Sequence, residues 1–147
     1  MKTPLKTSLV VLAGLCAFGA VAAQQGQTAV LWPAADIKWS DNPAITGAKI
    51  AVLWGDPKTG GYGALKTLPA GSTLRLHTHT YDQKVLLLSG AIVLSVQGGA
   101  SKELRSGSYA FIPGGVKHSA KCKAGARCVY FEEQPGASDI KFVEGAK

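Results

Sequence analysis

His77, His79 and His118 are the side chains best suited to chemistry in this sequence, and they are its only three histidines. His77 and His79 are separated by a single residue in an alternating segment, and alternation along a β-strand directs both imidazoles to the same face. A third histidine from a neighbouring strand would complete a set of nitrogen ligands for zinc or another divalent transition metal, with positions left for water or substrate. The alternative is three unrelated structural histidines, but the glycines and the proline around them favour a single metal site.

The elements that must position these histidines are short. Beyond residue 23 the sequence shows no repeat and no helical periodicity, and glycine and proline separate its apolar or alternating segments. The predicted strands are 49–54, 62–68, 73–79, 84–88, 91–97, 109–112, 128–132 and 140–143. Many short strands with turn signals between them predict an antiparallel all-β sandwich or barrel. The preceding arm at 31–42 carries Trp32 and Trp39 and is expected to pack as an irregular or edge element.

The spacing around the histidines resembles that of a small single-domain cupin. The positions that follow the two cupin motifs are Gly71, His77, His79, Gln83 and Gly90, then Gly107, Pro113, Gly115 and His118. The resemblance implies an all-β cupin double-stranded β-helix, which is a jelly-roll barrel. The expected domain covers 24–147, with an N-terminal arm at 24–47, a barrel core at 48–134 and a C-terminal strand or tail at 135–147. A homodimer is an arrangement that the resemblance allows.

Two positions depart from the cupin pattern. Gln83 stands where the family usually has glutamate, and Cys122 where it has asparagine. An amide is a poorer ligand than a carboxylate, so we expect three imidazoles plus water around the metal. Gln83 then either ligates through its carbonyl oxygen or donates its amide from outside the coordination sphere. The resemblance favours Fe²⁺, with Zn²⁺, Mn²⁺, Ni²⁺ and Cu²⁺ as alternatives, and the uncompensated metal charge would attract a small anionic substrate or ligand.

Arg75 has the same strand parity as His77, which predicts an inward side chain able to bind a substrate carboxylate beside the metal. A second interpretation, in which Arg75 reaches solvent at the end of the strand, stays open. Glu132 and Glu133 lie at a strand end and are expected to be solvated. Several aromatic residues are candidates for the pocket wall, although each is also typical of a core: Trp54, Tyr62, Tyr81, Phe111 and Tyr130.

The N-terminus has the pattern of a signal peptide, predicted at 1–23. Lys2 and Lys6 precede an apolar stretch at 9–20, and small residues follow, with cleavage expected after Ala22 or Ala23. The stretch is short for a bilayer span, so no stable membrane anchor is expected after processing. The predicted location is therefore periplasmic or secreted. Cys16 would be removed with the signal peptide.

Charge and cysteine content agree with export. The net charge is +7, and without Lys2 and Lys6 about +5, on basic residues scattered along the chain. Such scatter is typical of a solvated surface, and nucleic acid is not an expected partner of an exported protein. Cys122 and Cys128 are expected to form a disulfide across a hairpin in an oxidising compartment. The alternative is a free Cys122 thiolate that faces the metal site.

Two functions follow from the sequence and stay open. The first is a metal-dependent enzyme, and the resemblance to three-histidine cupins implies a dioxygenase-type oxidoreductase. The second is a non-catalytic exported cupin that binds a metal ion or a small ligand. A cupin that has lost its metal is disfavoured because all three histidines are present.

Overall fold

The computed structural model describes residues 28–145, so the predicted signal peptide and Cys16 lie outside the described residues. Residues 28–31 are exposed and have no regular secondary structure. The chain from Trp32 onward forms one compact unit. Within residues 28–145, no helix is long and apolar enough to cross a membrane.

The compact unit is built from strands, with one 3-10 turn, η1 (Ala34–Asp36), before the first of them. The strands are β1 (Ser40–Asp41), β2 (Lys49–Gly55), β3 (Tyr62–Leu68), β4 (Thr73–Thr78), β5 (Gln83–Ser89), β6 (Ala91–Val96), β7 (Lys102–Arg105), β8 (Tyr109–Ile112), β9 (His118–Cys122), β10 (Cys128–Gln134) and β11 (Lys141–Phe142).

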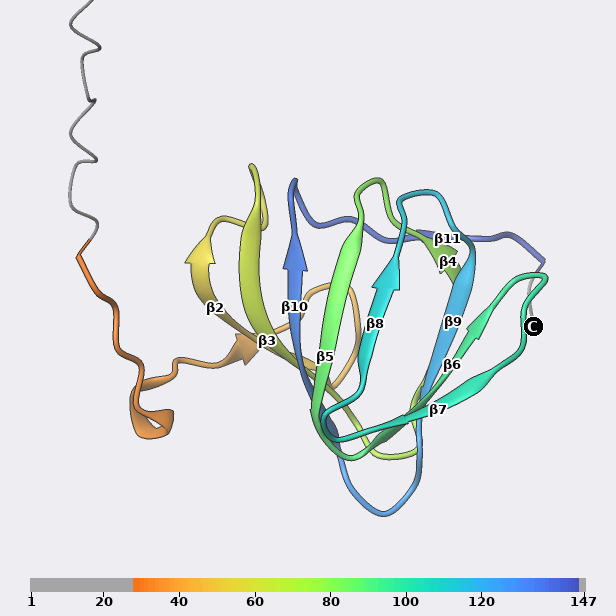
Figure 1. The fold of residues 1–147 in the computed structure, drawn as a ribbon, viewed down its shortest axis with the longest axis horizontal. Helices are drawn as coiled ribbons and strands as arrows, with labels where there is room; N and C mark the ends of the chain where they lie inside the picture. The colour runs from red at the N-terminus through yellow and green to blue at the C-terminus, as the bar shows by residue number, and fades with distance from the viewer. Residues whose placement is uncertain (1–27, 146–147) are drawn as a thin grey trace, which may run out of the picture. The chain divides into compact units, whose positions relative to one another are not determined.

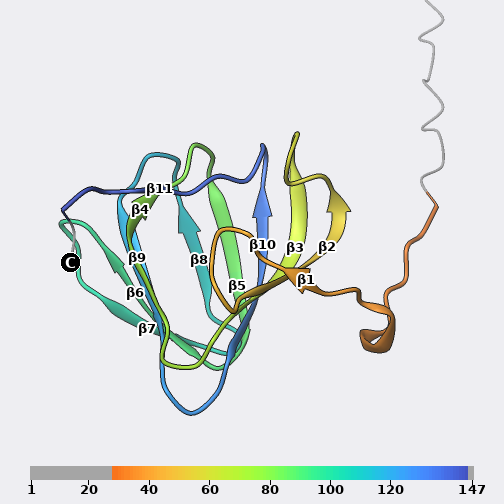
Figure 2. The same ribbon diagram turned by 180° about the vertical axis from the view of Figure 1, so that it is seen from behind.

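Two antiparallel sheets face each other across the interior (Figure 1). One has six strands in the order β1-β2-β3-β10-β5-β8, and the other has five in the order β11-β4-β9-β6-β7. In the reverse view of Figure 2, β1 lies at the edge of the larger sheet beside β2. This arrangement confirms the predicted all-β jelly roll.

Apart from the two-residue β1, which lies in the arm expected to be irregular or an edge element, the strands absent from the sequence prediction are β7 and β9. The sequence of β7, KELR, is mostly charged, and that of β9, HSAKC, has a histidine and a cysteine at its buried ends. Neither offers the alternation of large apolar residues that indicates a strand. Yet β9 lies between β4 and β6 in the middle of its sheet, and it carries one of the three histidines.

A β-bulge in β4 changes which side chains face inward. Leu74 pairs with Ala120 and His77 with His118, so β4 advances by one residue more than β9 between these pairs. An extra residue reverses the alternation on the bulged strand. Leu74 and His77 therefore both line the interior, although their sequence spacing is odd.

The apolar core lies at one end of the barrel, around a disulfide between Cys122 and Cys128. Its buried members are Leu68, Leu87, Ile92, Cys122, Cys128 and Tyr130. The two cysteines belong to β9 and β10, which lie in different sheets, so residues 123–127 do not form the predicted hairpin. The disulfide instead joins the two sheets.

Candidate metal centre

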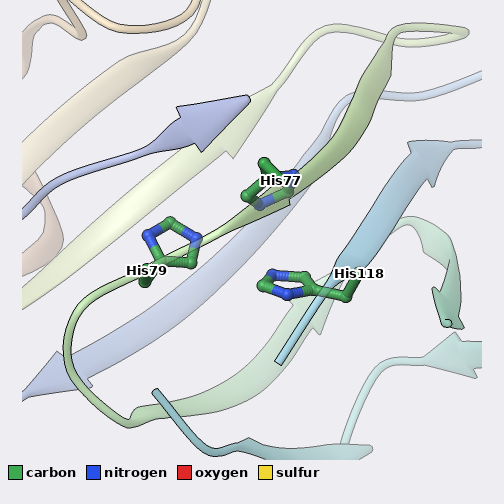
Figure 3. A group of neighbouring side chains, drawn as sticks. All are labelled: His77, His79 and His118. Carbon is green, nitrogen blue, oxygen red and sulfur yellow. The ribbon is translucent and has the colours of Figure 1, made fainter. Parts of the chain in front are cut away.

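The three histidines come together at the opposite end of β9 from the disulfide. His77 on β4 is paired directly with His118, the first residue of β9, and His79 follows just after β4 ends. The ring centroids are 4.2 Å apart for His77 and His118, 4.9 Å for His77 and His79, and 5.3 Å for His79 and His118. Figure 3 shows the three rings around a common space. One nitrogen of each ring lies within 4.8 Å of the others.

The backbone fixes the orientation of each imidazole. The Nδ1 of His77 lies 2.6 Å from the carbonyl oxygen of Arg75, and that of His118 lies 2.9 Å from the carbonyl oxygen of Val116. The Nδ1 of His79 meets the carbonyl oxygen of Asp139. A carbonyl only accepts, so each Nδ1 must carry the proton and donate it, and each Nε2 keeps its lone pair. Three Nε2 lone pairs on adjacent rings are what a metal ion requires.

Burial keeps these imidazoles neutral. Desolvation lowers the pKa of His77 to about 4, although its bond to the Arg75 carbonyl acts in the other direction. Burial likewise lowers the pKa of His79 and of His118. Neutral imidazole is the form that binds metal. Three buried, neutral and oriented histidines therefore fit a divalent transition metal such as zinc or ferrous iron.

Gln83, the first residue of β5, lies in the wall of the same cavity and is only 4% exposed. Its Nε2 is 3.2 Å from Oε2 of Glu132. An ionised carboxylate can only accept, which assigns the amide nitrogen to this contact. Of the residues that the structure describes, no acidic or thiol group joins the three histidines within the distance given above.

Glu132 was predicted to be solvated, and this is wrong: the residue is 3% exposed. Its Oε1 accepts a hydrogen bond of 2.6 Å from the hydroxyl of Tyr62 and one of 3.0 Å from Nε2 of Gln134. The same oxygen forms a close ion pair with Nζ of Lys66, which also donates to the Tyr62 hydroxyl at 3.0 Å. Lys66, counted among the scattered surface cations, is 6% exposed. Only Glu133, the neighbour of Glu132, is partly solvated.

The ion pair keeps both of its members charged. Burial alone raises the pKa of Glu132, but the charge of Lys66 and the hydrogen bonds from Lys66 and Tyr62 hold it below its usual range. Burial lowers the pKa of Lys66, but the charge of Glu132 outweighs it and raises the pKa above its usual range. The pKa of Tyr62 is raised, first by burial and then by the charge of Glu132. A fixed carboxylate, a fixed ammonium and a neutral phenol thus lie beside the histidines.

The alternation along β10 could have revealed this network. The sequence of β10, CVYFEEQ, is alternately buried and half-buried from Cys128 to Gln134. Counting in twos from the disulfide cysteine assigns Tyr130, Glu132 and Gln134 to the interior. Considered without this alternation, two adjacent glutamates indicate the polar end of a strand, which is the basis of the incorrect prediction for Glu132.

Arg75 does not belong to the site, because the bulge in β4 reverses the parity used to place it. Its side chain is exposed and its guanidinium carbon lies 4.8 Å from the ring centroid of Phe142. The inward position goes to Leu74. The predicted clamp for a substrate carboxylate is therefore wrong, and the solvent-facing interpretation is correct.

The cavity beside the histidines has a volume of about 730 Å³. Its wall is mainly aliphatic, with Leu74, Val85, Leu87, Ile92, Leu94, Leu104 and Ile112 among its members. The polar wall groups near the metal centre are Gln83, Glu132 and Lys66. Of the predicted pocket aromatics, Tyr130 lines the cavity, Tyr62 is buried without lining it, and Trp54, Tyr81 and Phe111 are exposed.

The segment after β10 forms part of the cavity wall, through Ser138, Asp139 and Ile140. It crosses from the larger sheet to the smaller one, where β11 pairs with β4 (Figure 1). On the way, the carboxylate of Asp139 accepts hydrogen bonds of 2.9 Å from the backbone nitrogen of Thr80 and 2.5 Å from its hydroxyl. Lys141 donates to the same hydroxyl at 2.7 Å. These bonds fix the carbonyl of Asp139 that orients His79.

Cys122 has no thiol to offer the metal, because it is bonded to Cys128. It pairs with Ile92 on β6, whereas His118 pairs with Val96, four residues away on both strands. At about 3.3 Å per residue this separation is about 13 Å. The alternative in which Cys122 supplies a thiolate to the site is therefore wrong in this structure.

Comparison with known proteins agrees with the geometry. Residues 21–134 match the family described as a domain of unknown function, DUF4437. No curated protein sequence matches the chain significantly.

Several solved structures share the fold. The polyketide cyclase RemF from Streptomyces resistomycificus is 18% identical with a TM-score of 0.65, over 79% of this chain and 86% of that one. The DMSP lyase DddQ from Ruegeria pomeroyi DSS-3 is 16% identical with a TM-score of 0.62, over 76% and 64%. An RmlC-like cupin from Shewanella frigidimarina NCIMB 400 is 21% identical with a TM-score of 0.58, over 74% and 93%. The chain therefore belongs to the DUF4437 family and has the cupin fold.

Proposed function

We propose that this protein is a metal-dependent enzyme that acts on a small molecule held in the cupin cavity. The observation that carries the proposal is the set of three buried histidines, each with Nδ1 held by a backbone carbonyl. A bound divalent metal would act there as a Lewis acid that stabilises an anionic oxygen of the substrate. Three histidines on an open surface could bind only a metal ion. The cavity beside these three is large enough to hold a ligand as well.

The cavity wall suggests the substrate class. Because most of the wall is aliphatic, the body of the substrate is apolar, and one polar end carries the enolate, phenolate or carboxylate that meets the metal. Because the Arg75 side chain is exposed and lies outside the cavity, the bound metal would supply most of the positive charge that attracts this anionic group. Lys66 adds little net charge because Glu132 neutralises it.

The chain's own groups support proton handling rather than redox chemistry. The hydroxyl of Tyr62, the carboxylate of Glu132 and the amide of Gln83 form one connected hydrogen-bonded chain toward the metal centre. Such a chain can hold a proton near a substrate while the surrounding aliphatic wall excludes water. Two of the similar structures are, by name, a cyclase and a lyase, which suits this class of reaction.

A dioxygenase-type oxidation with Fe²⁺ is the second candidate. It is favoured by the absence, among residues 28–145, of a carboxylate in the histidine group, which leaves positions for both a substrate and oxygen. Non-catalytic binding of a metal or a small ligand is the third outcome to be separated from these.

The test begins with metal analysis of protein purified from the periplasm, beside the His77→Ala/His79→Ala variant. About one metal ion per chain in the wild type and none in the variant supports the proposal. Turnover of enolisable or phenolic carboxylates is then measured with and without oxygen. Oxygen-independent turnover supports Lewis-acid chemistry, and iron-dependent oxygen uptake supports the second candidate. A wild type that binds no metal, even when Zn²⁺ or Fe²⁺ is added, refutes the proposal.

We further propose that the protein is exported and processed near Ala22 or Ala23. A disulfide that joins the two sheets supports this, because such bonds persist in oxidising compartments. Mass spectrometry of the protein in periplasmic and secreted fractions should find an N-terminus at Ala23 or Gln24. An intact N-terminus in the cell interior would contradict export.

A homodimer is also proposed, through the outer face of the six-stranded sheet. Tyr109 and Phe111 on β8 are 59% and 51% exposed, and the exposed Leu86 on β5 lies opposite Tyr109. Large exposed apolar side chains on one face of a sheet are typical of an interface. Light scattering after size exclusion should give twice the chain mass for the wild type and the chain mass for Tyr109→Glu/Phe111→Glu. A monomeric wild type would refute it.

A further inference from the structure

The carboxylate of Glu132 has one saturated oxygen and one that is almost free. Three donors meet its Oε1: the Tyr62 hydroxyl, Nζ of Lys66 and Nε2 of Gln134. Its Oε2 accepts only from Nε2 of Gln83, at 3.2 Å. Each carboxylate oxygen can accept about two hydrogen bonds, so Oε1 is fully used and Oε2 is directed to Gln83 alone.

This contact fixes both the orientation and the polarity of the Gln83 amide. With its nitrogen on Glu132, the amide has its carbonyl oxygen left to meet a cation, a water or a ligand in the cavity. A charged acceptor on the nitrogen side strengthens the bond and polarises the amide, which makes its carbonyl oxygen more negative. A flipped amide would place its oxygen against the carboxylate, so the flip is disfavoured.

The position of Glu132 suits this role. Its side chain lines the same cavity as the three histidines. The oxygen that Gln83 contacts, Oε2, is the one that does not bind the Lys66 ammonium, which lies on Oε1.

We propose that Glu132 is a positioning residue for the metal centre, and that through the amide of Gln83 it supplies the negative charge that a glutamate at position 83 would supply. In this arrangement the carboxylate belongs to β10 and not to the adjacent β5. The Gln83 amide lies between it and the metal centre and transmits the effect of its charge. This inference rests on the proposed function, since it presupposes that the histidines hold a metal.

The experiment measures the dissociation constant of Zn²⁺ for metal-stripped protein by competition with a chromophoric chelator. Glu132→Gln is expected to bind Zn²⁺ about 10-fold to 100-fold more weakly, as is usual when a group that orients a ligand is lost. The matched control is Glu133→Gln, the adjacent glutamate on the outer face, which should bind like the wild type. Glu132→Gln leaves Lys66 unpaired, so Lys66→Met/Glu132→Gln, with no buried charge, serves as the second variant and should show a loss of about 10-fold.

Exchange of the two groups distinguishes positioning from mere support of the fold. In Gln83→Glu/Glu132→Gln the amide and the carboxylate change places, and Zn²⁺ affinity should return to within about threefold of the wild type, a small part of the loss expected for an orienting group. The visible absorption of the Co²⁺-loaded protein gives an independent signature, which should change in Glu132→Gln but not in Glu133→Gln. A purely structural role would not be rescued by the exchange.

The outcomes separate this inference from the proposed function. A wild type that binds neither Zn²⁺ nor Co²⁺ refutes both. Tight binding in the wild type together with unchanged binding in both Glu132 variants refutes the positioning role and leaves the metal site intact. A loss in Glu132→Gln that the exchanged variant does not recover also overturns it, because charge at position 83 would then not replace charge at 132.

Discussion

Replacement of Lys66 by methionine would leave the buried carboxylate of Glu132 without its cation. The two side chains are 8% and 4% exposed, so solvent cannot take over the lost partner. Methionine has a similar length and no charge, which keeps the packing of β3 largely unchanged. The substitution therefore tests the electrostatic contribution of Lys66 in metal-free protein.

The expected loss is large because half of a buried ion pair remains. Removal of one partner of such a pair costs about 3–5 kcal/mol of the free energy of unfolding. For a domain of this size that corresponds to a fall in Tm of about 10–20 °C. Lys66→Met/Glu132→Gln should recover most of the loss, because it leaves no charge to desolvate.

The free energy of unfolding should change with pH in a defined direction in both the wild type and Lys66→Met. In the wild type the pKa of Glu132 is depressed, so its contribution is fully present above the unfolded pKa of about 4.5 and is lost as pH falls through the lower folded value. The raised pKa of Lys66 makes its contribution present below about 10.5 and lost only in strong alkali. In Lys66→Met the Tyr62 hydroxyl still donates to Glu132, but without the charge and the hydrogen bond of Lys66 the effect of burial prevails and raises the pKa of Glu132. The stability difference between wild type and variant should therefore shrink as pH falls from 8 to 5.

Urea unfolding followed by circular dichroism at several pH values measures this difference. The control is Lys84→Met, which breaks the exposed pair of Lys84 with Glu133 on the same sheet and should change the free energy of unfolding little. The reasoning is refuted if Lys66→Met is no less stable than Lys84→Met at pH 8, or if its deficit grows toward pH 5.

Three further predictions concern the histidines and the disulfide. Because the folded-state pKa of His77 is about 4, the metal-free folded protein binds fewer protons than the unfolded chain between about pH 4 and 6.5. Its free energy of unfolding should therefore fall as pH drops through that range. A urea midpoint that stays constant there would contradict this. Asp139→Ala should weaken Zn²⁺ binding about 10-fold by releasing the carbonyl that orients His79, while the exposed Asp36→Ala should not; chelator competition compares them. Cys122→Ser/Cys128→Ser should lower the free energy of unfolding in denaturant by about 2 kcal/mol and leave the Zn²⁺ affinity unchanged. A loss of metal binding would show that the disulfide and the histidines are coupled, which their separation along β9 does not predict.

The histidine site could be anticipated because its residues are local in sequence or fixed by turns. His77 and His79 are two apart where β4 ends, and the turn at Pro113 and Gly115 leads directly to His118. Glycine at 115 is needed there because its φ is +78°. Such short-range constraints are visible in a sequence, and the structure places the three rings together.

The predicted inward orientation of Arg75 is wrong because of a β-bulge, which no pattern within the sequence of β4 reveals. A β-bulge inserts one residue into one strand of a pair, and its position depends on the partner strand, here β9. A single inserted residue moves every earlier side chain of β4 to the other face. Parity arguments therefore hold only between bulges.

The Glu132 network was missed because buried charge is uncommon and the partners are distant in sequence. Lys66 and Glu132 are 66 residues apart, and each would be assigned to the surface if considered alone. Only the pairing of β3 with β10, in which Lys66 lies opposite Tyr130 and Ala64 opposite Glu132, brings them together. The predicted hairpin between Cys122 and Cys128 is wrong for a similar reason, since the chain passes from one sheet to the other there.

The bond between His79 and the carbonyl of Asp139 spans 60 residues, and this separation imposes an order on events during synthesis. A nascent chain that has emerged only as far as β9 already contains all three histidines, yet the ring of His79 has no partner to hold its tautomer. A metal ion bound by the three histidines would therefore meet its complete site only once Asp139 has been made and the following segment has docked on β4. An ion met earlier would encounter an incomplete and weaker site. The metals available where folding is completed, and not where the histidines are first made, would thus decide which ion is retained.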